Sequence, residues 1–442
     1  LRPPLIEKKT IIAPATASGR GGISVIRMSG PRSEVIAQEM CGQMADPWRF
    51  KRCEIRSGEN LVIDSCMVVF FKSPHSYTGD DVIEFHCHGN PTIINLVIET
   101  AIKLGAVVAE PGEFTKTAFL NDKIDLAQAE SVADLINAQS ESAVIAANSS
   151  LTGKFSDAIN NILDELTAIR VFVEANIDFP EEDIDKSLLN TCVDRLKSLS
   201  DQTTQLISSA VGGVKLRDGY SVAIVGPPNA GKSTLLNLLA RENVAITSNI
   251  PGTTRDLVKV PVNLDGVLIE FIDTAGMRDN PENEIEKEGI NRSREVIEKS
   301  NLSLVVQDAN RIVEFDFGME DFISVYNKCD LYGGQKKNGE GIFYITATTG
   351  QGVPELLKGL VNKLDIDEGQ ETAFLSRQRH VSCLTEGGLR IDESLTSLEE
   401  GQGLELVAEN LKNSHRVLGE ILRPLSSDDL LGEIFSEFCI GK

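Results

Sequence analysis

The stretch Gly226-Pro-Pro-Asn-Ala-Gly-Lys-Ser233 follows the apolar run Ser221-Val-Ala-Ile-Val225 and precedes a helical pattern at residues 234–240. A buried strand, a glycine-rich turn and a helix in this order are typical of a phosphate-binding loop, whose backbone N–H groups surround phosphate oxygens. Lys232 supplies a positive charge for the β and γ phosphates, and Ser233 supplies an oxygen for Mg²⁺. The stretch therefore predicts a nucleoside triphosphate site.

Two further loops follow apolar strands. The run Val267-Leu-Ile-Glu-Phe-Ile272 ends in Asp273-Thr-Ala-Gly276, where Asp273 can hold the Mg²⁺ shell and the glycine can approach the γ-phosphate. A strand at residues 322–326 ends in Asn327-Lys-Cys-Asp330. The Asp330 carboxylate can accept hydrogen bonds from N1–H and the 2-amino group of guanine, and adenine lacks that donor edge. The loops therefore predict selection of GTP over ATP.

These loops, in this order, resemble those of the Ras-like GTPase superfamily. The fifth loop of that superfamily is replaced here by Thr346-Ala-Thr348, which keeps a hydroxyl beside the base. The connection at residues 309–321 is short and acidic, so we expect the helix usual at this position to be truncated or disordered. The residues predicted to contact GTP are Asn229, Ala230, Gly231, Lys232, Ser233, Thr234, Ser248, Thr253, Thr254, Asp273, Thr274, Ala275, Gly276, Asn327, Lys328, Asp330, Thr346, Ala347 and Thr348.

Hydrolysis needs a residue that orients water, and Met277 stands where Ras-type proteins carry glutamine. Glutamates at 282, 284, 286 and 288 lie nearby and remain alternatives. The segment Glu286-Lys-Glu-Gly-Ile290 resembles a stretch of one GTPase family with a water-orienting glutamate three residues before glycine, which favours Glu286. Ser233 and Thr254 are the predicted Mg²⁺ ligands.

Asn229 in the phosphate loop is either a turn former or a ligand for a monovalent cation. A K⁺ ion at its amide oxygen would add positive charge where Ras-type proteins use an arginine finger. The predicted K⁺ ligands are Asn229, Ser248, Ile250 and Thr253.

The whole chain of 442 residues is long enough for about three domains. Its net charge of −23 argues against a chain-wide nucleic-acid surface, so that an RNA partner would need a local patch. Residues 1–120 carry equal numbers of acidic and basic side chains, so this first segment is compositionally separate. The apolar stretches are too short to cross a bilayer and the N-terminal residues do not resemble a signal peptide, so we expect a cytoplasmic protein with reduced cysteines.

The predicted fold class is a multidomain α/β plus all-α protein. Strand-like segments favour an α/β domain at residues 1–120, and helical periodicity favours helices at 121–215 and again at 373–442. The α/β pattern at 216–372 lies between them. We therefore predict that the two helical segments pack as one domain, with a Ras-like P-loop domain inserted through exposed connections near Gly213 and Gly369.

Outside the GTPase motifs, the chain resembles the bacterial tRNA-modification GTPases known as the MnmE or TrmE family. The resemblance covers nearly the whole sequence. It is carried by the segments Gly19-Arg-Gly-Gly-Ile-Ser-Val-Ile-Arg-Met-Ser-Gly30, Ser76-Tyr-Thr-Gly-Asp-Asp-Val-Ile-Glu-Phe-His-Cys-His-Gly89, Pro111-Gly-Glu-Phe-Thr-Lys-Thr-Ala-Phe-Leu-Asn-Asp-Lys-Ile-Asp-Leu-Ala-Gln128 and the terminal Cys439-Ile-Gly-Lys442. The sequence departs from the family at Thr117, where an arginine usually stands, and in Ser376-Arg-Gln-Arg-His380.

The resemblance implies a homodimer joined through N-terminal domains that each bind a one-carbon tetrahydrofolate, in the 5-formyl or methylene form. It also implies an FAD-containing partner of the MnmG type, which would complete a heterotetramer and act with the chain on tRNA. Together they would place an aminomethyl or carboxymethylaminomethyl group on C5 of the wobble uridine, with GTP hydrolysis. By position, the folate contacts fall on Arg27, Glu84, Lys123 and Lys442.

Two cysteine-containing segments raise further possibilities. The alternation of His86-Cys87-His88 on a strand directs Cys87 away from both histidines, which argues against a metal site. The Cys439 thiol is a candidate catalytic group. Alternative functions are a ribosome-assembly or signalling GTPase without carbon transfer, and a folate-binding scaffold whose GTPase sets conformation.

Overall fold

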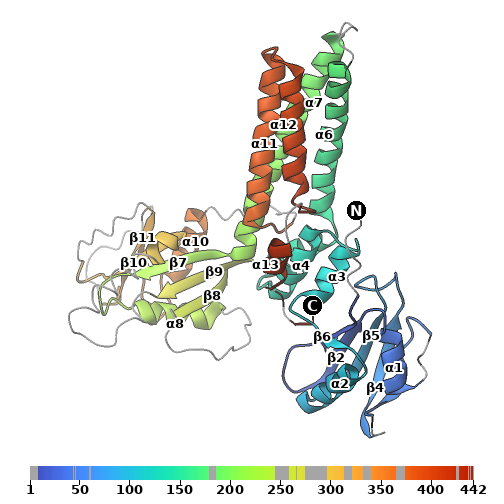
Figure 1. Cartoon of the computed structure of the whole chain (residues 1–442). Helices are drawn as coiled ribbons and strands as arrows, with labels where there is room; N and C mark the ends of the chain where they lie inside the picture. The colour runs from blue at the N-terminus through green and yellow to red at the C-terminus, as the bar shows by residue number, and fades with distance from the viewer. Residues whose placement is uncertain are drawn as a thin grey trace, which may run out of the picture. The chain divides into compact units, whose positions relative to one another are not determined.

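The structure is a computed structural model that describes residues 8–42, 44, 46–58, 61–178, 186–243, 258–264, 266–273, 296–312, 321–331, 339, 341–364, 374–424, 428–436, 438 and 440–441. The chain folds into two compact units. Leu1–Ala133 and Leu418–Lys442 form the first unit, and Asp134–Val417 form the second. Figure 1 shows their helices and strands.

The first unit contains a six-stranded sheet with the order β3-β4-β5-β2-β1-β6, antiparallel except for the β1–β6 pair. Its strands are β1 (Ile11–Pro14), β2 (Gly21–Ser29), β3 (Lys51–Arg56), β4 (Val62–Phe71), β5 (Val82–Gly89) and β6 (Val107–Val108). Alternate residues of β1 to β5 form a buried core with helices α1 (Ser33–Cys41) and α2 (Pro91–Lys103). The opposite face of the sheet carries Arg27, Glu84 and His86, because strand residues alternate between faces.

The first unit also includes helices from distant parts of the sequence: α3 (Glu113–Leu120), the greater part of α4 (Leu126–Asn137) and α13 (Asp428–Ser436). Phe435 and Phe438 are buried against Leu126 and Ala129 of α4. An isolated antiparallel bridge joins Pro111 to Ile440. The last part of the sequence therefore packs on the N-terminal unit, although its periodicity alone suggested membership of the helical domain.

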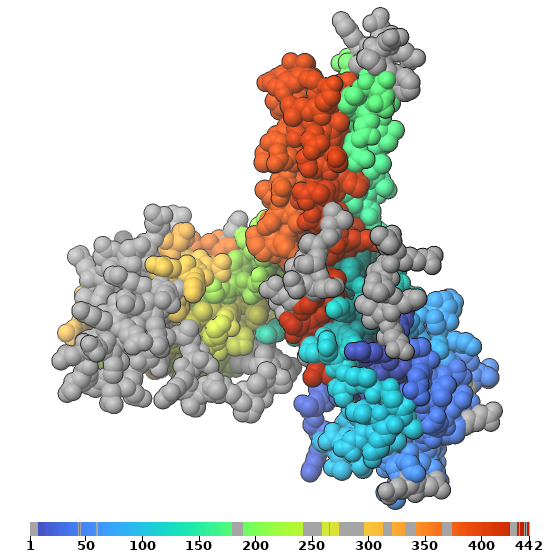
Figure 2. All heavy atoms as spheres, viewed as in Figure 1, coloured from blue at the N-terminus to red at the C-terminus, as the bar shows by residue number. Residues whose placement is uncertain are grey.

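The second unit contains long helices: α5 (Glu141–Leu151), α6 (Lys154–Asp178), α7 (Lys186–Asp218), α11 (Gln378–Glu399) and α12 (Leu404–Gly419). The apolar stripe predicted on α6 is buried at Ile159, Ile162, Leu166 and Ile169. Helices α6, α7, α11 and α12 run side by side (Figures 1 and 2). In the part of the chain that the structure describes, no helix is long and apolar enough to span a membrane.

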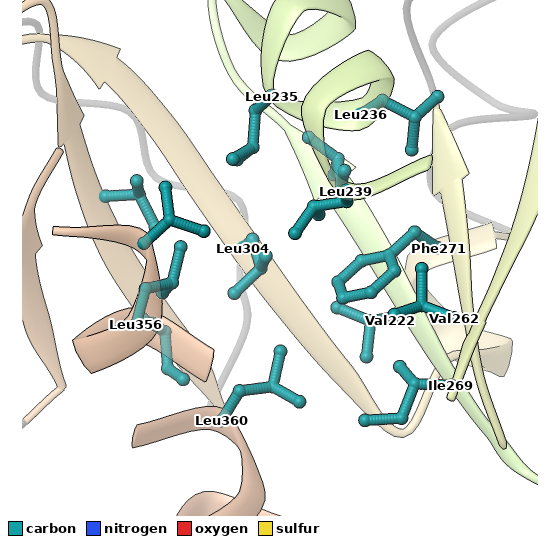
Figure 3. Close-up of a cluster of buried hydrophobic side chains, with 14 of the residues drawn as sticks. Val222, Leu235, Leu236, Leu239, Val262, Ile269, Phe271, Leu304, Leu356 and Leu360 are labelled. Carbon is teal, nitrogen blue, oxygen red and sulfur yellow. The ribbon is translucent and has the colours of Figure 1, made fainter. Parts of the chain in front are cut away.

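A second sheet, with the order β12-β11-β10-β7-β9-β8, is parallel except for the β8–β9 pair. Its strands are β7 (Tyr220–Val225), β8 (Val258–Leu264), β9 (Val267–Asp273), β10 (Leu302–Asp308), β11 (Phe322–Asn327) and β12 (Ile342–Tyr344). Leucines of α8 (Lys232–Asn243) and α10 (Val353–Lys363) pack with residues of these strands in one core (Figure 3). The predicted multidomain α/β plus all-α class is confirmed.

The two chain connections between the helices and this sheet are fixed by one carboxylate. The buried Asp134 accepts hydrogen bonds from Arg217 Nε at 2.9 Å and from Arg377 Nη2 at 3.0 Å. The first connection was expected near Gly213, but α7 continues to Asp218 and Gly213 is buried. A side chain at Gly213 would collide with the Phe374 carbonyl, so this glycine permits close packing instead of a turn. Gly369 lies outside the described residues.

Candidate functional site

The phosphate loop connects β7 to α8, at the carboxyl edge of the parallel sheet. Gly231 has a φ of 95°, and a Cβ there would collide with the Asn327 side-chain nitrogen. Asn229 has a φ of 62°, in the left-handed region that asparagine tolerates better than most residues. The loop therefore has the sharply turned backbone that directs N–H groups inward around an anion.

Lys232 and Ser233 lie where the loop becomes a helix. The Lys232 ammonium donates hydrogen bonds to the carbonyls of Gly226 at 2.8 Å and Pro227 at 2.9 Å, so its charge lies inside the loop. Ser233 Oγ donates to Asp273 Oδ2 at 3.2 Å. A hydroxyl and a carboxylate at this separation are the kind of oxygen donors that Mg²⁺ prefers, so these residues fit the ion.

Asn327 holds three predicted nucleotide loops together. Its side-chain N–H donates to the Ala230 carbonyl at 2.9 Å, and its Oδ1 accepts from the Ala347 N–H at 3.0 Å. Asn327 is 3% exposed, so water cannot readily replace either bond. One buried side chain thus fixes the phosphate loop and the 346–348 loop relative to the end of β11.

The residues predicted around the base lie next to this junction. The Lys328 ammonium binds Asp308 Oδ2 at 2.8 Å, and this bond, together with the Asn310 N–H, lowers the pKa of Asp308. Asp330 is exposed at the end of the same loop. Thr346 is 1% exposed, and its Oγ1 has no hydrogen-bond partner among the residues that the structure describes. A buried, unsatisfied hydroxyl beside the predicted base site suits a ligand that brings a polar group.

Several predicted residues lie outside the described part of the chain: Ser248, Ile250, Thr253, Thr254, Thr274, Ala275, Gly276, Glu286, Cys439 and Lys442. Met277 and the truncated helix expected before β11 fall there too, the latter at residues 313–320. Their roles stay predictions. Of the other residues predicted to contact GTP, Ala230 is buried within the phosphate loop, Thr234 is exposed in the first turn of α8, and Thr348 is exposed at the end of the 346–348 loop.

A second cluster lies on the sheet of the first unit. Arg27 of β2 and Glu84 of β5 face each other in the ladder, and Arg27 donates to Glu84 Oε1 through Nε and Nη2, each at 2.9 Å. The guanidinium lies over the Tyr77 ring at 5.2 Å and the Phe114 ring at 5.9 Å. The cluster thus combines a charge pair with two aromatic faces, which suits a planar, polar ligand with an anionic tail.

Lys123 lies against the loop that carries Tyr77. Its ammonium donates to the Pro74 carbonyl at 3.0 Å, and Tyr77 shares a hydrogen bond of 2.8 Å with Thr115. Burial raises the pKa of Tyr77, so the phenol stays neutral at physiological pH. The structure therefore brings Arg27, Glu84 and the Lys123 loop into one neighbourhood.

The described end of the chain lies against β1 of the same unit. Gly441 has a φ of 97°, and a Cβ there would collide with the Pro14 carbonyl. Only glycine permits this close approach, so Gly441 allows the terminal segment to lie directly against the end of β1.

The cysteine-histidine segment behaves as the strand alternation predicted. Cys87 is buried in the core, and a hydrogen bond with Cys66, together with burial, raises the pKa of its thiol. His88 is 69% exposed and binds the Asp64 carboxylate instead. Within the described ranges, no group of histidine, cysteine, aspartate or glutamate side chains is arranged to hold a metal ion.

Sequence reasoning missed three partners of the candidate sites. Asp308, which restrains Lys328, is the last residue of a buried strand, as Asp273 is, and that position could have identified it. Tyr77 and Phe114 occur within the family segments but had no role assigned, because their contact with Arg27 depends on tertiary packing.

The parallel sheet and its loops define a P-loop domain of the guanine-nucleotide-binding class. Family models for the "MnmE helical domain" and the "GTP-binding protein TrmE N-terminus" match residues 126–439 and 10–123. A "tRNA modification GTPase MnmE" of Legionella pneumophila (strain Paris) is 42% identical over 98% of this chain and 99% of its own. One of Coxiella burnetii (strain Dugway 5J108-111) is 41% identical over 98% and 99%.

The G domain of the T. maritima FeoB iron transporter is 22% identical, covering 33% of this chain and 98% of its own, with a TM-score of 0.24. That score is too low to carry an argument. The sequence and family matches are sufficient: the chain belongs to the MnmE family, and the resemblance seen in its motifs is confirmed.

Proposed function

We propose that the chain is a GTP-hydrolysing enzyme of tRNA modification that acts on C5 of the wobble uridine. The observation that carries the proposal is the junction at Asn327, which holds the phosphate loop and the 346–348 loop together in one site. Its relatives are named tRNA modification GTPases, and the similarity covers nearly the whole chain. The function therefore requires both the nucleotide loops and the N-terminal unit.

In the nucleotide site, Lys232 and the backbone N–H groups of residues 229–234 would hold the phosphates. Ser233 and Thr254 would hold Mg²⁺, with Asp273 in its shell, and the ion would neutralise charge on the β and γ phosphates. Asp330 would select guanine, while Lys328, restrained by Asp308, would cover one face of the base.

We assign water orientation to Glu286 and the monovalent cation to Asn229, Ser248, Ile250 and Thr253. A K⁺ ion would supply positive charge at the phosphates, and the chain's own oxygens would be ordered around it. We expect faster GTP hydrolysis and closer approach of the two G domains of a dimer in KCl than in NaCl, measured with a transition-state mimic. Asn229→Ala should remove the difference and keep nucleotide binding, and equal rates in both salts would assign Asn229 to the turn alone.

In the N-terminal unit, Arg27, Glu84, Lys123 and Lys442 would hold a one-carbon tetrahydrofolate, which supplies the carbon that is transferred. The paired Arg27 and Glu84 fit such a ligand, because Arg27 binds Oε1 of the Glu84 carboxylate while Oε2 has only a long contact of 3.4 Å with His86, and the Tyr77 and Phe114 rings flank the pair. Cys439 would act on the same reaction. Titration calorimetry with 5-formyl-tetrahydrofolate tests this assignment.

The partners follow from the same proposal. The chain would form a homodimer through residues 1–120 and join an FAD-containing MnmG-type protein in a heterotetramer in the cytoplasm. The helical segments 121–215 and 373–442 would carry the inserted G domain, 216–372. Mass spectrometry of wobble uridines from cells lacking the chain gives the decisive test. An unchanged uridine profile, with GTP hydrolysis retained in vitro, would instead favour an assembly or signalling GTPase.

A further inference from the structure

A short exposed segment of the first unit combines aromatic and basic side chains. Residues 48–52 read Trp-Arg-Phe-Lys-Arg, and all five are exposed. The last two are the first residues of β3, which is an edge strand of the sheet. Three positive charges within five residues stand out in a chain whose net charge is −23. The segment is therefore a local positive patch.

The two aromatic rings of this patch are held in place but largely open. Trp48 is 60% exposed and meets Phe71 edge to face at 4.8 Å, and Phe50 is 55% exposed and meets His86 in the same way at 5.1 Å. A single edge-to-face contact fixes a ring while leaving much of its surface accessible. Both rings can therefore accept a stacking partner without rearrangement.

The backbone at Trp48 is unusual for such a large residue. Its φ is 66°, in the left-handed region that bulky side chains rarely adopt, and its N–H donates to the Phe70 carbonyl at 2.8 Å. This unfavourable backbone, held by a hydrogen bond to β4, points to a role for the side chain it presents.

Basic residues on an edge strand also discourage pairing with another sheet. That role explains Lys51 and Arg52 but not two exposed aromatic rings, which favour association. Aromatic rings interleaved with arginine and lysine suit single-stranded nucleic acid, because every base offers a face for stacking and every nucleotide offers a phosphate. Arg52 donates to the neutral Ser65 hydroxyl at 3.1 Å, so this contact leaves its charge available.

The patch is continuous with the Arg27–Glu84 cluster. Phe50 contacts His86, His86 Nε2 lies 3.4 Å from Glu84 Oε2, and Glu84 binds Arg27. A base stacked on Phe50 would therefore be separated from the proposed one-carbon site at Glu84 and Arg27 only by the His86 side chain.

We propose that the patch formed by residues 48–52 binds an unpaired RNA loop, with bases stacked on Trp48 and Phe50 and phosphates on Arg49 and Arg52. Lys51 lies on the other face of β3, where it shares the side of Cys53 and Ile55 and adds only to the local positive charge. The site rests on the proposed function, because it presumes an RNA substrate whose unpaired base must reach the carbon donor. It adds the surface that takes that substrate.

Trp48 is the only tryptophan of the chain, so its fluorescence reports on the patch directly. The full-length protein is titrated with a short RNA stem–loop that has an unpaired uridine in its loop, and with a blunt RNA duplex of equal phosphate count. We expect the stem–loop to quench Trp48 emission and the duplex to leave it nearly unchanged. Phe50→Ala should weaken stem–loop binding about tenfold, the loss typical of one stacked base.

Fluorescence anisotropy of labelled RNA provides the remaining comparisons. Arg49→Gln should lower the slope of affinity against salt by about 0.7, the value for one phosphate contact on a single strand. Leu120→Ala and Lys103→Gln, which alter an exposed apolar and an exposed basic residue of the same unit, should have no effect. Circular dichroism melts confirm that the variants are folded.

Equal quenching by stem–loop and duplex, or no quenching by either, would overturn the proposal. So would conversion of a dimer to monomers by Phe50→Ala in sedimentation, because the patch would then be a contact between copies. GTP hydrolysis by the wild-type chain, measured separately, tests the proposed function, so that a failed RNA site with active hydrolysis overturns this inference alone.

Discussion

The nucleotide site and the Arg27–Glu84 cluster are built in different ways. The nucleotide site consists mainly of backbone turns at the carboxyl edge of a parallel sheet, tied together by Asn327. The cluster consists of side chains on adjacent antiparallel strands that are 57 positions apart in sequence. Backbone sites leave a continuous motif in the sequence, whereas side-chain sites are completed by register and packing. The following predictions test this contrast.

The largest effect should come from a residue that acts only on the reacting water. Glu286→Ala should lower kcat for GTP hydrolysis by about 10² to 10⁴, the usual contribution of a positioned acid–base group, and leave GTP affinity nearly unchanged. Single-turnover kinetics measure the change. Glu284→Ala provides the matched control, and a larger loss in that variant would transfer the role to the neighbouring glutamate.

Removing the junction should damage the nucleotide site as a whole. Asn327→Ala leaves the Ala230 carbonyl and the Ala347 N–H buried without their partner, at about 1–3 kcal/mol each. We expect GTP affinity to fall by about 10² and the G domain to melt earlier. Asn301→Ala is a matched control, since Asn301 also binds backbone at Ser221 N–H but is exposed at the other end of the strands. Similar losses in both variants would show that Asn327 stabilises the domain without organising the site.

The loop that carries Asp330 can be tested without disturbing the junction at Asn327. Asp330→Asn replaces an acceptor of two guanine donors, which should weaken GTP binding by about 2 kcal/mol and shift preference toward xanthosine triphosphate. Competition between the two nucleotides, followed by fluorescence, measures the shift. Unchanged preference would mean that the loop has been assigned wrongly.

The side-chain cluster should respond differently. Arg27→Gln removes the charge that holds Glu84 and should weaken tetrahydrofolate binding by about 1.5–3 kcal/mol while leaving GTP binding intact. Calorimetry with each ligand separates the two sites. Arg52→Gln removes one positive charge from an exposed position of the same sheet, and it therefore controls for the change in net charge. Loss of GTP affinity in Arg27→Gln would break the independence of the two sites.

The same contrast explains what the sequence could predict. The order of strand, glycine-rich turn and helix specified β7, the phosphate loop and α8, because backbone conformation there depends on neighbouring residues. The assignment of Arg27 and Glu84 to one site followed from resemblance, but their pairing and its support by Tyr77 and Phe114 were missed. The position of Gly213 was misread because glycine serves both turns and close helix packing, and only the position of Phe374 distinguishes them.

The smallest effect concerns the far end of β5, where His88 anchors the sheet beside the cluster. Burial alone would raise the pKa of Asp64, but hydrogen bonds from the His88 N–H, the His88 ring and the Ser65 N–H outweigh it and lower the pKa. A carboxyl group with a depressed folded-state pKa stabilises the fold above its unfolded value of about 3.9, and this stabilisation is lost as the pH falls through the folded pKa. Asp64→Asn should therefore destabilise the sheet by about 1 kcal/mol at pH 7 and destabilise it less at pH 3. Hydrogen exchange of the Ser65 and His88 amides, compared between variant and wild type at each pH, measures the difference. An equal loss of protection at both pH values would show that the side chain of Asp64 stabilises the sheet through its packing and hydrogen bonds and not through its charge.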